Sequence, residues 1–315
     1  MDYRQITPFG ADRPAADDAP TLAQLDRDLD DMWTAYQAAS FGYVTARLPS
    51  LLAHAQAAAE YYNGDDLMHA RRVLGLAYQL AATQLTKLGE AELAWIAADR
   101  GLNAARTTGD PVVTGSLYRS VTHALLSAGR YSEAVRLTER AAGYLEANLS
   151  QPTPELLSIH GTLFLASSMA ASRNNDRTAT RAFLDAADES AKRLGHDANH
   201  VWTAFGPTNV AIHRVATAAE LGDVQVAIDL GPRIDTAPLP MERRVRHALE
   251  VARTYSRRNR VDDAQATLLD AEQLAPEQVR YHFLSRELVL GWIRQQPGKP
   301  STVLVGLARR LNVLS

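Results

Sequence analysis

The stretch LEVARTYSRRNRVDDAQATLLDAEQLAP, residues 249–276, contains two helical segments joined by a short turn. Ala252 lies seven residues before Asn259, and Ala264 and Ala271 lie five and twelve residues after it. Asparagine readily adopts the left-handed backbone conformation that ends a helix. Small side chains at these offsets let the second helix lie close against the first. The stretch therefore predicts an antiparallel helix pair.

Four earlier turns follow the same pattern, which indicates a repeating unit. The five turn residues are glycine or asparagine: Gly89, Gly129, Asn174, Gly222 and Asn259. Alanine follows each of them five residues later, at Ala94, Ala134, Ala179, Ala227 and Ala264. Before the turn at Gly222 a small residue is reached only at Ala216, so we expect a one-residue slip in that pair.

These offsets resemble those of the tetratricopeptide (TPR) repeat, which also has an aromatic residue in its first helix and a proline at its end, as at Tyr255 and Pro276. The turns are more widely spaced than the usual period of about 34 residues, so we expect an irregular array. The predicted fold is all-α: a right-handed superhelix of about seven TPR-like antiparallel helix pairs over residues 21–315.

Two regions depart from this pattern. Residues 1–20 are proline-rich and poor in apolar side chains, which predicts a flexible tail or linker remnant. A predicted helix from His200 to Leu221 contains Gly206 and Pro207, and we expect a kink there because proline lacks a backbone donor and clashes with the preceding turn.

Composition excludes several classes of protein. The formal net charge is -3, which lacks the positive excess of a dedicated DNA-binding surface. The chain has no cysteine, so it has neither disulfides nor thiolate metal ligands, in keeping with a reducing compartment. No apolar run approaches the roughly 20 residues needed to cross a bilayer. We therefore expect a cytoplasmic protein that does not associate with membranes.

Several segments resemble the C-terminal sensor region of actinobacterial XRE-type helix-turn-helix transcription regulators. They are Lys87–Leu102 (KLGEAELAWIAADRGL), Asp197–Asp223 (DANHVWTAFGPTNVAIHRVATAAELGD), Met241–Ala252 (MERRVRHALEVA) and Leu274–Leu290 (LAPEQVRYHFLSRELVL). The resemblance implies a TPR-like array that senses an effector and controls a regulator. DNA would be bound only through a helix-turn-helix domain that is absent from this chain, either removed or naturally missing.

The first helix of each pair is expected to line the concave groove, so residues ten and six before each turn should point inward. With neighbouring aromatic and polar groups, the candidate ligand-binding residues are Arg119, His123, Phe164, Trp202, Phe205, Asn209, His213, Arg246 and Arg253. The three arginines show no facing carboxylate, and guanidinium groups grip carboxylate or phosphate in a fork. The predicted effector is a peptide or a small acidic molecule.

The sequence shows no catalytic machinery, no metal site and no cofactor motif, so we do not expect an enzyme. The leading hypothesis is a ligand- or peptide-sensing domain of a transcription regulator, in which binding shifts the curvature of the stack. The alternative is a constitutive protein–protein interaction scaffold with no small ligand. A homodimer is expected from two-fold operators and from the exposed ends of a solenoid.

Overall fold

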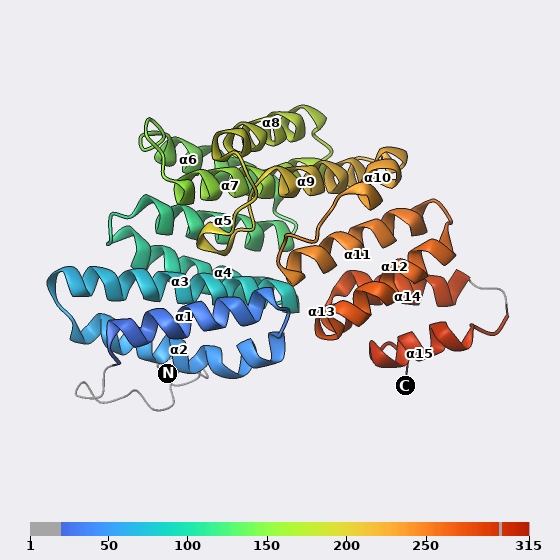
Figure 1. Ribbon diagram of the computed structural model, residues 1–315, viewed down its shortest axis with the longest axis horizontal. Coiled ribbons are helices and arrows are strands. Elements are labelled where there is room, and N and C mark those ends of the chain that lie inside the picture. Colours follow the sequence, from blue (N-terminus) through green and yellow to red (C-terminus); the bar gives the residue numbers. More distant parts are fainter. Residues whose placement is uncertain (1–19, 296–297, 315) are drawn as a thin grey trace.

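The computed structural model describes residues 20–295 and 298–314, and shows an all-α solenoid (Figure 1). Its α-helices are α1 (Leu22–Gln37), α2 (Phe41–Tyr61), α3 (Gly64–Leu88), α4 (Ala91–Arg106), α5 (Pro111–Ser127), α6 (Tyr131–Glu146), α7 (Pro154–Arg173), α8 (Arg177–Leu194), α9 (Pro207–Glu220), α10 (Val224–Leu230), α11 (Met241–Arg257), α12 (Val261–Leu274), α13 (Pro276–Tyr281), α14 (Phe283–Gln295) and α15 (Thr302–Arg310). The predicted all-α solenoid is confirmed. Of the predicted tail, all but residue 20 lies outside the described residues.

Consecutive helices pack as pairs, from α1 with α2 through to α11 with α12, and α14 packs on α15. The first helices α1, α3, α5, α7 and α9 also pack on one another in that order and form the inner layer of the stack. In the described part of the chain, β-structure is limited to one isolated bridge between Ala198 and Phe205. None of the described helices has the length and apolar character that crossing a bilayer requires.

Side-chain caps fix the starts of several inner helices. The Asp110 carboxylate accepts from the backbone N–H groups of Val112 and Val113 at 2.8 and 3.3 Å, and Pro111 occupies the first helical position. Thr153 caps α7 in the same way, with the N–H of Leu156 donating at 3.2 Å. Such caps satisfy donors that a helix start leaves free, so they set where α5 and α7 begin.

The repeat register holds at four of the five turns. Gly89, Gly129, Gly222 and Asn259 have φ angles of 87°, 72°, 86° and 56°, as the left-handed turn requires. The alanines five residues later, Ala94, Ala134, Ala227 and Ala264, are fully buried.

The pair formed by α7 and α8 is the one that slips, and the prediction of a slip at Gly222 is wrong. Asn174 has a φ of -83°, while its neighbour Asn175 has a φ of 57° and makes the left-handed turn. Five residues after Asn175 comes the buried Thr180, whereas Ala179 is half-buried. At the Gly222 turn, Val215 is in register and packs in the core.

The predicted helix from His200 to Leu221 is also wrong in its first third. Pro207 starts α9 at its first position, so there is no helix before it to kink. Residues 195–206, the covering segment, instead form a loop containing a short 3₁₀ turn, His200–Trp202. Proline disfavours helical geometry in the residue before it, and Gly206 is extended at φ 160°. Residues 276–295 form two helices, α13 and α14, which are divided at His282.

The solenoid closes on itself, which the repeat pattern does not predict. Helix α11 contacts α1 and helix α13 contacts α2, as Figure 1 shows for α13 beside the N-terminal helices. The backbone N–H of Gly42 donates to the Glu277 carboxylate at 2.8 Å, and Lys87 on α3 pairs with Glu242 on α11. One hydrophobic core cluster accordingly contains residues from both ends of the stack. The concave groove therefore becomes a partly enclosed cavity.

Candidate ligand-binding site

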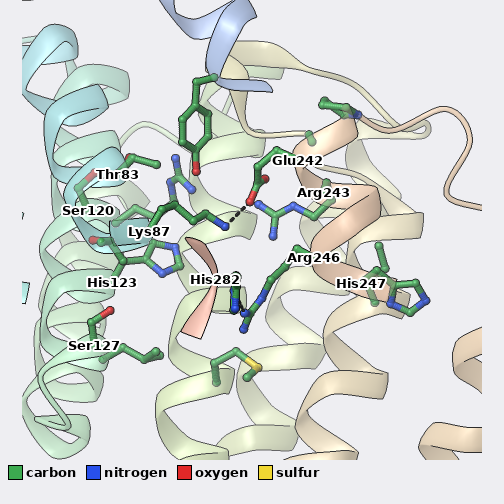
Figure 2. Close-up of a pocket in the computed structure, with 18 of the residues that line it drawn as sticks. Thr83, Lys87, Ser120, His123, Ser127, Glu242, Arg243, Arg246, His247 and His282 are labelled. Carbon is green, nitrogen blue, oxygen red and sulfur yellow. Dashed lines mark hydrogen bonds and ion pairs between the residues drawn. The ribbon is translucent and has the colours of Figure 1, made fainter. Parts of the chain in front are cut away.

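A cavity of about 200 Å³ lies where the inner helices face α11. Its walls come from α1, α3, α5, α7, α9 and α11, together with Trp202 and Ala204 of the covering segment and His282 between α13 and α14. Residues far apart in the chain, such as Lys87 and Glu242, therefore line the same cavity, shown in Figure 2.

The lining follows the repeat. Residues six before four of the five left-handed turns line the cavity, at Thr83, His123, Met169 and Ala216. Residues two before the turn line it at Lys87, Ser127 and Arg173. These positions are four apart on one helix face, so a single register brings both rows inward. The corrected turn at Asn175 is what selects Met169 and Arg173 in α7.

The covering segment is tied to α1 beside the cavity. The Gln37 amide donates to Asn199 Oδ1 at 3.0 Å, and the Asn199 amide donates to Gln37 Oε1 at 2.8 Å. The Trp202 ring stacks on Trp33 with centroids 5.0 Å apart and an interplanar angle of 6°. Further back, the Thr208 hydroxyl donates to Asp197 at 2.6 Å. The segment therefore joins α9 to α1 and places Trp202 in the wall of the cavity.

Five of the nine candidate residues come together in this cavity: Arg119, His123, Trp202, His213 and Arg246. They derive from α5, the covering segment, α9 and α11. The sequence analysis did not select Lys87, Arg173, Glu242, Arg243 or His282, which also line it. Extending the inward face by one further helical turn would have found Lys87, and Arg173 would have followed only with the turn placed at Asn175.

The other four candidates lie outside the cavity lining. Phe164 packs against Phe183, with ring centroids 5.9 Å apart, because the register of α7 is shifted by one residue. Phe205 is fully buried in a separate core cluster, and Asn209 is 1% exposed. Arg253 pairs with Glu220 at 3.1 Å and with Glu250 at 2.6 Å, so it does have facing carboxylates.

Arg246 also has a carboxylate partner, contrary to the prediction. It pairs with Glu250 at 2.6 Å, one helical turn along α11. Because Glu250 lies four residues after Arg246 and three before Arg253, this sharing was visible in the sequence spacing. Of the three predicted arginines, only Arg119 lacks a carboxylate partner in the described chain.

Arg119 and Arg243 are the two cationic side chains of the cavity without an ion pair or a side-chain hydrogen bond to any described residue. Arg119 is 8% exposed, and the Nε–H groups of both arginines are buried without an acceptor. Burial and the neighbouring Arg243 lower the pKa of Arg119 to about 10. The guanidinium stays charged at neutral pH, in a site that disfavours its charge.

The other cationic side chains of the lining each contact a carboxylate. Burial opposes ionisation of Glu242, but Lys87 and Arg243 nevertheless lower its pKa to about 2. Arg173 pairs with Glu220 at 3.2 Å. Because Arg253 shares both Glu220 and Glu250, and Arg119 and Arg243 have no carboxylate partner, the cavity presents a net positive potential to a ligand.

Four histidines line the same space: His123, His213, His247 and His282. Burial lowers the pKa of each, and nearby arginines add to the effect at His123, His213 and His282. The pKa of His213 falls to about 3, and its Nδ1–H donates to the Asn209 carbonyl at 2.9 Å. These rings are neutral at pH 7, so they act as hydrogen-bonding groups rather than as additional cations.

Among the residues that the structure describes, no group of three or more histidine, aspartate and glutamate side chains is arranged to hold a metal ion. The chemistry that this site offers is therefore recognition by guanidinium forks, hydroxyl groups, neutral imidazoles and an aromatic wall.

No protein-family model matches the chain. No curated protein matches it either. Among solved structures, the crystal structure of BtubC (BKLC) from P. vanneervenii is similar at 15% sequence identity and a TM-score of 0.47, over 85% of this chain and 95% of that one. A likeness at this level carries no argument about function.

Proposed function

We propose that this chain is the effector-binding domain of a cytoplasmic transcription regulator, and that its effector is a small molecule enclosed by the solenoid. The observation that carries the proposal is the closure of the groove by α11 and the covering segment. The resemblance to XRE-type sensor regions provides the link to transcription, and a homodimer is part of the proposal.

The size of the cavity favours a small molecule over a peptide. Its volume of about 200 Å³ lies below the range of about 300 to 1,000 Å³ typical of drug-sized ligand pockets. A peptide helix is about 10 Å across with its side chains, and would require the two ends of the stack to separate. A compact acidic metabolite fits the space with the stack closed.

Closure also supplies a route from binding to regulation. The lining is shared between helices of the N-terminal stack, α1, α3, α5 and α7, and helix α11 near the C-terminal end. A ligand that contacts both has a higher affinity for the closed arrangement than for an open one, so binding shifts the population toward closure. Surfaces at the ends of the solenoid then change their relative position, which a dimer or an attached DNA reader can sense.

The test compares two substitutions to phenylalanine in a thermal-shift screen against metabolite and peptide pools. Ala216→Phe fills the cavity from α9, whereas Gln225→Phe introduces the same side chain on the exposed surface of α10. We expect a compound that raises the melting temperature of the wild type and of Gln225→Phe, and not that of Ala216→Phe. If no compound acts while a protein co-purifies with the chain, the scaffold alternative replaces this proposal.

A further inference from the structure

Two of the cationic side chains that line the cavity take part in no ion pair with a described residue. Five cationic side chains line it: Lys87, Arg119, Arg173, Arg243 and Arg246. Three of them contact a carboxylate: Lys87 contacts Glu242, Arg246 contacts Glu250, and Arg173 contacts Glu220. Arg253, outside the lining, shares both Glu220 and Glu250. Arg119 and Arg243 remain.

The two unmatched guanidinium groups stand on opposite sides of the closure. Arg119 comes from α5, in the N-terminal stack, and Arg243 from α11. Figure 2 shows Arg243 extending from α11 toward Lys87, whose ammonium group forms an ion pair with Glu242. Both Nε–H donors are buried and have no acceptor. Buried N–H donors normally have a hydrogen-bond acceptor, so the missing acceptors point to a bound ligand that supplies them.

We propose that the effector carries a compact dianionic group, a phosphate ester or a dicarboxylate, which bridges Arg119 on α5 and Arg243 on α11. This inference rests on the proposed function and assigns the chemical class of its ligand. Two negative charges neutralise the two guanidinium groups, whereas a monoanion leaves one of them buried and uncompensated. Each fork can hold two oxygens side by side, which suits a phosphate or a pair of carboxylates.

Neutral groups around the arginines fit the same ligand. Ser120 lies one residue from Arg119 on α5, and Thr83 and His123 also line the cavity. The His123 imidazole N–H can donate to a further oxygen of the ligand without adding charge. The Thr83 and Ser120 hydroxyls donate to the Gln79 and Ser116 carbonyls at 2.8 and 3.2 Å, so they line the cavity as neutral polar groups. The stacked Trp33 and Trp202 rings form an apolar wall in the same cavity, available to the carbon skeleton that bears the charges.

The charge argument also predicts the behaviour of the protein without a ligand. Burial already penalises each guanidinium, and Arg119 and Arg243 repel one another. Arg119→Gln removes one of the two charges and keeps a polar side chain of similar length. We expect this variant, free of ligand, to melt about 1–2 °C above the wild type. A lower melting temperature for the ligand-free variant would overturn the charge argument.

Binding is measured by calorimetry with inorganic phosphate, malonate, acetate and chloride at constant ionic strength. We expect phosphate or malonate to bind and the two monoanions to bind at least tenfold more weakly. Arg119→Gln and Arg243→Gln should each weaken binding by about tenfold to a hundredfold. Arg140→Gln, on the exposed face of α6, is the matched control and should leave the affinity unchanged.

The outcomes separate the two proposals. A response to phosphate alone assigns a phosphate ester, and a response to malonate alone assigns a dicarboxylate; both support the inference. If the metabolite screen yields a neutral or cationic ligand whose binding is abolished by Ala216→Phe, the proposed function is supported and the assignment of a dianionic ligand is overturned. Arginine variants that bind phosphate and malonate as the wild type does overturn the assignment of Arg119 and Arg243.

Discussion

Replacing Gly161 by alanine tests how the covering segment is anchored. Gly161 lies in the middle of α7, where a Cβ atom would stand 1.9 Å from Cζ of Phe205 and 2.4 Å from its Cε2. The Phe205 ring is fully buried, and its carbonyl accepts from the backbone N–H of Ala198 at 2.9 Å. Because neither the ring nor its backbone has room to retreat, the segment must shift as a whole.

Two opposing effects set the magnitude. Alanine is favoured over glycine inside a helix by about 1 kcal/mol. Overpacking a well-filled core by one methyl group costs about 1–3 kcal/mol, and the overlap with Phe205 favours the upper end. We expect a net loss of about 2 kcal/mol, which corresponds to a fall in melting temperature of roughly 3 °C for a chain of this length.

The matched control is Gly143→Ala in α6, where an added Cβ meets nothing within 4 Å. That variant should gain up to about 1 kcal/mol from helix propensity alone. The assay is thermal and urea unfolding of both variants, with tryptophan emission as a second readout, because Trp202 moves with Phe205. A Gly161→Ala protein as stable as Gly143→Ala would refute the close packing of Phe205 on α7. Adding Phe205→Leu should restore part of the loss.

Two further predictions concern charge inside the cavity. Burial, followed by Arg243, lowers the pKa of His213 to about 3, whereas the unfolded chain binds that proton near pH 6.5, so stability is lost as the pH falls. Between pH 7.5 and 5.5 this residue alone should cost about 1.4 kcal/mol; urea unfolding at both pH values should show a smaller drop in His213→Gln, and an equal drop in both proteins would contradict the pKa. Glu242→Gln leaves the largely buried Lys87 ammonium without its carboxylate and should cost about 3 kcal/mol, while Lys87→Met combined with Glu242→Gln should recover most of it. A double-mutant cycle on the free energy of unfolding measures the coupling, and additive effects would show that the pair is not coupled.

Local signals in the sequence were sufficient for the helix pairs. Glycine or asparagine at a turn, followed by alanine after five residues, is a rule about neighbours in the chain, and four of the five turns obey it in the structure. The failure at Asn174 has a local cause as well. Two asparagines stand side by side there, both able to adopt the left-handed conformation, and the pattern alone did not decide between Asn174 and Asn175.

Only part of the candidate site could be predicted from the sequence. Arg119, His123 and His213 followed from the inward face of the first helices. Glu242 and Arg243 could not be predicted in this way, because they reach the cavity only where α11 packs against the N-terminal stack. That contact depends on small packing angles that accumulate over several helix pairs, and no short-range pattern encodes their sum. Arg119 is informative for the same reason, since its lack of a carboxylate partner depends on every element that surrounds it.

The covering segment links these observations. Val201, Trp202 and Ala204 have φ angles of 49°, 53° and 48°, each unfavourable by about 1–2 kcal/mol for a residue with a side chain. The conformation is held by contacts at both ends, Phe205 against Gly161 on one side and Asn199 and Trp202 against α1 on the other. Separating α1 from the segment would remove half of those contacts and release the backbone. This unfavourable backbone is therefore held in place by the contact with α1, and α1 also lines the cavity that contains Arg119 and Arg243.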